Sequence, residues 1–233
     1  LGKTDEWLYE KITTSGASGE AADRDFFNVW SSGTQSSPLS TKLNEIIRNS
    51  EVDPEHNEIT KDNYIVRWYL PEEEIETYMA EGHFVIGLDS SEAVGRDGIG
   101  MVVKDIRDLG VVAAATLNET NLIRFSKFLA DFMIKYPTTT LIPEKKSTGQ
   151  MIVDSLILIF LKHGIDPFKR IYNRIVDDQA NYKEEFKMIS VDMARRPSYI
   201  YDKYKKLFGF NTTGESRNTL YSSVLQNAAK KGG

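Results

Sequence analysis

The sequence lacks cysteine altogether and holds only three histidines among its 233 residues. Without thiols there is no disulfide, no thiolate nucleophile and no cysteine-held zinc or iron–sulfur site. The histidines, His56, His83 and His163, are scattered along the chain, which argues against a metal centre built from imidazoles. A metal site here would therefore use oxygen ligands, which favour Mg²⁺ or Mn²⁺.

Long apolar runs are also missing. The longest, Met151 to Leu161, is interrupted by Asp154 and Ser155 and falls short of the roughly 18 apolar residues that a membrane span needs. The start of the sequence has no charged-then-apolar leader, so we expect neither export nor a membrane partner. The pattern G-x-x-x-x-G-K-[ST] is absent as well, so we expect no ATP site of that kind.

Charge is unevenly distributed along the chain. The net charge is −5, yet residues 160–233 carry 14 lysines and arginines against 8 acidic residues. A basic segment of this kind can lie against a polyanion, although a solvated helical face has the same composition. The 40% of hydrophobic residues is enough to bury a core for one large domain.

Regular patterns of apolar residues begin near residue 83. Short apolar and β-branched runs predict five strands, at 84–88, 99–104, 111–117, 138–143 and 168–176. Apolar residues at helical spacing predict helices at 121–136, 148–163, 184–202 and 218–230. The first three strands, joined by short turns, favour an antiparallel meander. The order βββαβαβ indicates an α/β fold in which helices flank a mixed sheet.

The first 80 residues are richer in acidic and turn-forming residues. Residues 49–63 are expected to form loops, whereas 63–70 have the aromatic and β-branched content of a strand. Pro71 and the glutamates after it start a helix that we interpret as a connector.

Two acidic residues follow directly on predicted strands. Asp89 comes after 84–88, and Glu144 comes after 138–143. If those strands are neighbours in one sheet, the carboxylates converge and can hold two divalent ions, as two-metal phosphodiester hydrolysis requires. Asp97, at the head of the second strand, would reach the same site across the turn. An acid at a strand end can also be a turn former or a helix cap.

The sequence around these acids resembles a known family. The stretch GLDSSE at 87–92, with Gly95, Asp97 and Gly98 after it, and PE followed by STG within 143–149, resemble the nuclease domain of the large terminase subunit of tailed bacteriophages. The resemblance covers about residues 83–180. It implies a ribonuclease H-like fold and a metal-dependent endonuclease that cuts concatemeric double-stranded DNA during viral genome packaging.

The resemblance also implies a set of metal ligands. Asp89 and Glu144 would bind two catalytic Mg²⁺ or Mn²⁺ ions, with Asp97 as a supporting ligand. The family completes its site with an aspartate on a late helix, in a His-Asp or Asp-Asp pair that does not follow residue 218 here. We expect either that the chain stops before that helix or that Asp177 or Asp178 takes its place.

The same resemblance suggests a domain arrangement and partners. The segment ITTSG at 12–16 resembles the threonine-rich coupling segment of the terminase motor. Residues 1–70 would then be the end of the ATPase domain, 71–82 a linker, and 83–233 a nuclease domain truncated at its C-terminal end. The implied partners are double-stranded DNA, the small terminase subunit and the portal protein, in the host cytoplasm.

Basic residues near the acids and in the C-terminal part are candidates for DNA binding, because phosphate contacts supply most non-specific affinity. They are Lys145, Lys146, Arg170, Arg174, Arg195 and Arg196. Two other functions remain alternatives. One is a non-catalytic DNA-binding or assembly module with an incomplete metal site. The other is an actin-like phosphotransferase, whose first strand also ends in an aspartate, although a second glycine-rich phosphate loop is missing.

Overall fold

The computed structural model describes residues 4–15, 26, 48–49, 51–90, 98–118, 121–145, 148–177, 197–213, 216, 219–220 and 223. The chain divides into two compact units, one formed by Leu1–Val52 with Gly214–Gly233 and the other by Asp53–Thr213. In the first unit, helix α1 (Asp5–Ser15) buries none of its side chains. Across the described residues, no helix combines the length and the apolar character needed to cross a membrane.

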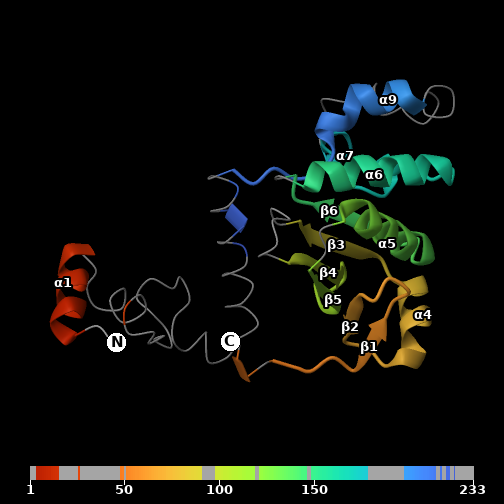
Figure 1. Ribbon diagram of the computed structural model, residues 1–233. Helices are drawn as coiled ribbons and strands as arrows, with labels where there is room; N and C mark the ends of the chain where they lie inside the picture. The colour runs from red at the N-terminus through yellow and green to blue at the C-terminus, as the bar shows by residue number, and fades with distance from the viewer. Residues whose placement is uncertain are drawn as a thin grey trace. The chain divides into compact units, whose positions relative to one another are not determined.

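A mixed sheet forms the centre of the second unit (Figure 1). In the described residues it has six strands, in the spatial order β1 (His56–Ile59), β2 (Ile65–Trp68), β5 (Val111–Leu117), β4 (Ile99–Asp105), β3 (Phe84–Asp89) and β6 (Thr139–Pro143). Strands β3, β4 and β5 form the predicted antiparallel meander. Strand β6 lies parallel to β3 at the edge. A parallel return needs a long crossover, which helix α5 supplies.

Two amphipathic helices, α5 (Leu122–Lys135) and α6 (Gly149–Lys162), lie side by side (Figure 1). Helix α5 begins where the Asn121 side chain accepts a hydrogen bond from the backbone N–H of Arg124, an N-cap contact. Its aromatic face reaches the sheet, where Phe132 stacks on the fully buried Trp68 at 6.0 Å between ring centroids. The bounds of both helices agree with the predicted ranges to within a residue.

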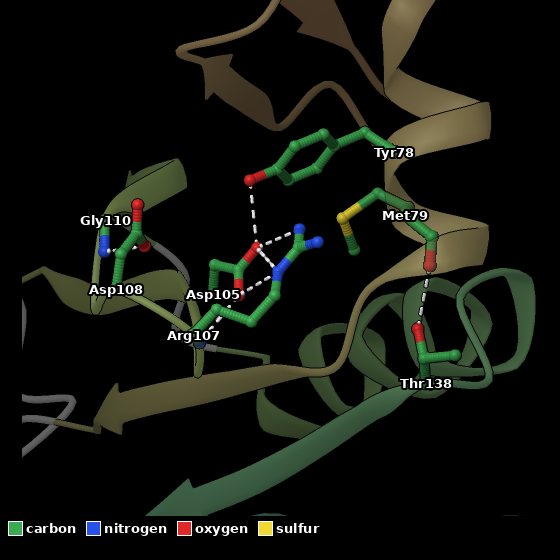
Figure 2. Close-up of polar contacts among 7 residues, drawn as sticks. All are labelled: Tyr78, Met79, Asp105, Arg107, Asp108, Gly110 and Thr138. Atoms are coloured by element: carbon green, nitrogen blue, oxygen red, sulfur yellow. Dashed lines mark hydrogen bonds and ion pairs between the residues drawn. The ribbon is translucent and has the colours of Figure 1, made fainter.

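Helix α4 (Glu72–Glu81) belongs to the same unit as the sheet. Three glutamates occupy its first turn, where the helix dipole favours negative charge. It buries Ile75 and Met79, and the Thr138 hydroxyl donates to the Met79 carbonyl at 2.8 Å (Figure 2). The compact unit begins at Asp53, and Ile75 and Met79 of α4 belong to its core.

The predicted strand at 168–176 is wrong. A 3₁₀ helix, η1 (Pro167–Lys169), starts there because Pro167 fixes its φ and the Asp166 carboxylate accepts from the Phe168 N–H. Two isolated bridges follow, between Ile171 and Leu141 of β6 and between Asn173 and Phe208. The chain then forms α7 (Arg174–Asp177) and, further on, α9 (Pro197–Tyr204) and η2 (Lys205–Leu207).

Candidate acidic site at the ends of two parallel strands

Asp89 and Glu144 lie at the adjacent carboxyl ends of two neighbouring parallel strands. The register of β3 and β6 places Leu88 opposite Pro143, and the Glu144 N–H donates to the Leu88 carbonyl at 3.0 Å. Asp89 is the last residue of β3, where it pairs with Gly100 of β4. Convergence of the two carboxylates requires that their strands be neighbours, and β3 and β6 are neighbours.

The start of α6 closes against these strand ends. The Thr148 hydroxyl donates to the carbonyl of Ser90 at 2.9 Å, and Ser90 itself is buried. A Cβ atom on Gly149 would lie 1.9 Å from the Glu144 carbonyl oxygen and 3.0 Å from the Ser90 hydroxyl. Only glycine permits this close approach of the helix to the strand end. The backbone that carries Glu144 is thus held from two sides, by β3 and by α6.

Both acids remain accessible from solvent. Asp89 is exposed and Glu144 is half-buried. Asp97 lies in residues 91–97, outside the described residues, so its place relative to the pair is not defined. Within the described ranges, no group of three or more histidine or acidic side chains has a geometry that would hold a metal ion.

A segment from the C-terminal part forms the other neighbour of β6 at this end. The Phe210 N–H donates to the Pro143 carbonyl, and the Lys145 N–H donates to the Phe210 carbonyl, both at 2.8 Å. The Lys145 ammonium donates to the carbonyl of Lys206 at 2.7 Å. Burial lowers the pKa of Lys145, the carboxylate of Asp154 raises it, and the Arg174 guanidinium lowers it.

The sequence did not predict these contacts between Lys145 and the C-terminal segment. The ammonium of Lys145, a candidate DNA-binding residue, donates to a backbone carbonyl. The aliphatic part of its side chain lies against Gly209, where an added Cβ would be 2.5 Å from the lysine Cγ. The one available signal was Gly209 itself, which has a positive φ of 77°. A glycine between two aromatic residues marks a backbone turn, but nothing in the sequence says what it turns against.

Arg170 lies at the far end of β6 from Glu144. Its guanidinium donates to the Thr139 carbonyl at 2.9 Å and to the carbonyls of Met133 and Tyr136 at the end of α5. Burial lowers the pKa of Arg170. These contacts give the arginine a structural role, joining α5 to β6, and we do not carry it into the proposed DNA interface.

The other candidate residues divide in a simple way. Arg174 is exposed at the start of α7. Asp177 is the last residue of the same helix, and nothing is defined for its side chain. The remaining candidates fall outside the described residues: Lys146, Asp178, Arg195 and Arg196.

Among the acidic residues that the structure describes, Asp105 has the most perturbed pKa, and it lies at the opposite end of the sheet from Asp89. Antiparallel pairing places Asp105 opposite Phe84, the first residue of β3. Figure 2 shows its carboxylate accepting from the Tyr78 hydroxyl and the Arg107 guanidinium. The Arg107 hydrogen bonds hold the pKa of Asp105 far below its usual range, against the effect of burial. We interpret this group as the contact that fixes α4 to the sheet.

The fold and the strand-end geometry define a mixed α/β protein with an accessible acid pair beside a helix start. No family model and no curated protein sequence matches this chain.

Proposed function

We propose that this chain contains the metal-dependent nuclease domain of a phage large terminase subunit, an endodeoxyribonuclease that cuts concatemeric double-stranded DNA in the host cytoplasm. The observation that carries the proposal is the position of Asp89 and Glu144, on the adjacent carboxyl ends of β3 and β6. The sequence resemblance supplies the family, and with it the small terminase subunit and the portal protein as partners.

The arrangement of elements supports a ribonuclease H-like fold. From β3 to β6 the chain follows the expected order of three antiparallel strands, a helix and a parallel fourth strand. The next helix, α6, also falls where the resemblance requires it. The additional strands β1 and β2 extend the sheet beyond β5, away from the acid pair.

The donor set suits hard divalent cations. Two carboxylates on fixed backbones, both accessible to solvent, provide the oxygen ligands that Mg²⁺ and Mn²⁺ prefer. By resemblance, Asp97 and either Asp177, Asp178 or an acid beyond this sequence would complete the set. Two such ions would supply activation of the attacking water and stabilisation of the leaving oxygen.

The chain's own residues hold and orient this pair. The Glu144 backbone is fixed by its hydrogen bond to Leu88 and by contact with Gly149, so its carboxylate starts from a defined position. The first turn of α6 lies beside the same strand ends, and its dipole lowers the cost of gathering negative charge there. Pre-positioned ligands reduce the reorganisation needed when ions and DNA bind.

The proposal is tested by cleavage of plasmid DNA with the full chain in Mg²⁺ or Mn²⁺. Asp89→Asn and Glu144→Gln should each reduce cleavage at least a hundredfold, with little change in melting temperature because Asp89 is exposed. Glu81→Gln is the matched control, because Glu81 is an exposed acid at the opposite end of β3. Full cleavage by Asp89→Asn, or cleavage that continues in EDTA, would refute the proposed function.

A further inference from the structure

A cavity of about 280 Å³ opens at the C-terminal segment that pairs with the end of β6. Its walls include two exposed cations, Arg174 and Lys206, and two half-buried aromatic residues, Tyr172 and Phe210, with Asn211 beside them. Of the described residues that line it, none is acidic. The cavity therefore has a net positive lining in a chain whose net charge is −5.

The cavity shares a wall with the strand end that carries Glu144. Phe210 forms a parallel bridge with Glu144, and its backbone is bonded on one side to Pro143 and on the other to Lys145. The Lys145 ammonium, bonded to the carbonyl of Lys206, adds positive charge behind the lining. A ligand in the cavity would thus contact Phe210, the residue that pairs with Glu144.

The lining combines the two features that proteins use to hold an unpaired nucleic-acid strand. Arginine and lysine contact phosphate oxygens, and arginine can do so with two parallel hydrogen bonds. Aromatic side chains stack on bases without regard to sequence, because every base has a π-face. A base inside a duplex is already stacked on its neighbours, so aromatic walls favour an unpaired nucleotide over a paired one.

The walls are fixed before a ligand arrives. Gly209 adopts a positive φ of 77°, and the backbone on either side of it is hydrogen-bonded, Gly209 to the Tyr172 carbonyl and Phe210 to the Pro143 carbonyl, each at 2.8 Å. One backbone hydrogen bond therefore ties Tyr172 to Gly209, the residue that precedes Phe210. Preorganised walls lower the entropy cost of binding.

We propose that this cavity binds one unpaired nucleotide of a DNA strand, with its phosphate on Arg174 and Lys206 and its base against Tyr172 and Phe210. The choice of DNA rests on the proposed function, whereas the phosphate and aromatic chemistry comes from the lining. The site holds a frayed or newly cut strand end near the end of β6, where Glu144 pairs with Phe210.

The test measures binding without cleavage. A fluorescent single-stranded oligonucleotide is titrated with the full chain in EDTA, and anisotropy gives the affinity at several salt concentrations. The double variant Arg174→Gln/Lys206→Gln should bind at least tenfold more weakly, and its log–log salt slope should fall by about 1.4, the value for two lost phosphate contacts on a single strand. Lys205→Gln is the matched control, because this neighbouring lysine pairs with Asp202 and does not line the cavity.

Phe210→Leu tests the aromatic wall separately and keeps the backbone contacts of that residue. It should weaken the single strand at least fivefold and leave a blunt duplex unchanged. A strand made entirely of abasic sites, which offers phosphates and no bases, should bind wild type and Phe210→Leu equally. Thermal unfolding of each variant verifies that it is folded.

Three results would overturn the inference: unchanged affinity of the double variant, equal loss of single-strand and duplex binding in Phe210→Leu, or displacement of the oligonucleotide by millimolar inorganic phosphate as effectively as by a nucleotide. Strand binding and cleavage are measured separately, so the two proposals can fail separately. Asp89→Asn should bind the single strand as wild type does. If wild type binds the strand but does not cleave DNA in Mg²⁺ or Mn²⁺, only the proposed nuclease function is refuted.

Discussion

Replacing Asp105 by alanine should destabilise the second unit while leaving the acid pair untouched. The Asp105 side chain is only 1% exposed, and it accepts hydrogen bonds from the Tyr78 hydroxyl at 2.9 Å, the Arg107 N–H at 2.8 Å and the Arg107 guanidinium. Its removal leaves the hydroxyl of Tyr78 without this acceptor. The Arg107 guanidinium can hydrogen-bond to water in place of Asp105, because the Arg107 side chain is 58% exposed, and this limits the loss of stability. We therefore expect a loss of about 2–3 kcal/mol, the upper part of the range for leaving a buried hydrogen-bonding group without its partner.

The loss should appear as a fall in melting temperature of about 4–10 °C for a unit of this size, measured by circular dichroism. Urea unfolding gives the free energy directly. Tyr78→Phe removes one hydrogen bond from the same group and should cost about 1 kcal/mol. A loss below about 0.5 kcal/mol for Asp105→Ala, the scatter of ordinary surface changes, would refute the assignment of this group as the contact that fixes α4 to the sheet.

The same group predicts a pH dependence of stability. Because the Arg107 hydrogen bonds hold the pKa of Asp105 below its ordinary value of 3.8, the folded state binds the proton later than the unfolded state as pH falls. The contribution is complete above about pH 5 and is lost as pH drops through about 4 towards the folded pKa. The difference in free energy of unfolding between wild type and Asp105→Ala should therefore shrink between pH 5 and pH 3. A constant difference over that range would contradict the proposed pairing.

Two further substitutions test the geometry around the acid pair. Gly149→Ala places a Cβ atom 1.9 Å from the Glu144 carbonyl oxygen. It should therefore lower the free energy of unfolding in urea by about 3 kcal/mol and weaken Mn²⁺ binding in calorimetry. Wild-type values of both would show that the helix start does not fix Glu144. Arg170→Gln removes charged hydrogen bonds to the carbonyls of Met133 and Thr139. It should lower the free energy of unfolding by about 2 kcal/mol without changing DNA affinity. A weaker DNA affinity in a stably folded variant would show that Arg170 contacts DNA.

The central strands were predictable because each is a short apolar or β-branched run bounded by turn-forming residues. In β3 the structure buries Phe84, Ile86 and Leu88, which alternate with more exposed residues along the strand. Short connections join β3, β4 and β5, and such connections favour antiparallel pairing. Helix α5 between β5 and β6 allows β6 to lie parallel to β3. The adjacency of Asp89 and Glu144 follows from this topology, which is why the acid pair could be anticipated from the sequence.

Strand β1 could not be predicted because it contributes little to the core. Its sequence, HNEI, is mostly polar, and Ile59 is 71% exposed. It pairs with β2 alone, as an edge strand held by backbone hydrogen bonds that any residues can make. The predicted strand at 168–176 failed for the converse reason. Phe168, Ile171 and Ile175 are buried, but Pro167 and the Asp166 cap start a 3₁₀ helix in place of a strand.

The roles of the basic residues depended on tertiary contacts that no local pattern encodes. Lys145 and Arg170 both resemble phosphate ligands in sequence, yet both donate to backbone carbonyls, of Lys206 in one case and of α5 and β6 in the other. Arg174, a candidate on the same grounds, is exposed and lines the cavity together with Lys206, which the sequence did not single out. Charge in the sequence therefore does not distinguish the basic side chains that are available to a ligand from those that hold the fold.

If a shifted pKa were the only criterion for a functional acid, it would select Asp105, at the end of the sheet away from Asp89 and Glu144. Asp105 is buried and its oxygens are occupied by Tyr78 and Arg107, so its charge is satisfied within the fold and has no capacity left for a cation. Asp89 is exposed at the carboxyl end of β3, beside a second carboxylate and a helix start. Accessibility together with strand direction distinguishes the two acids. Perturbation of the pKa marks the group that stabilises the fold, and topology marks the pair proposed to act on DNA.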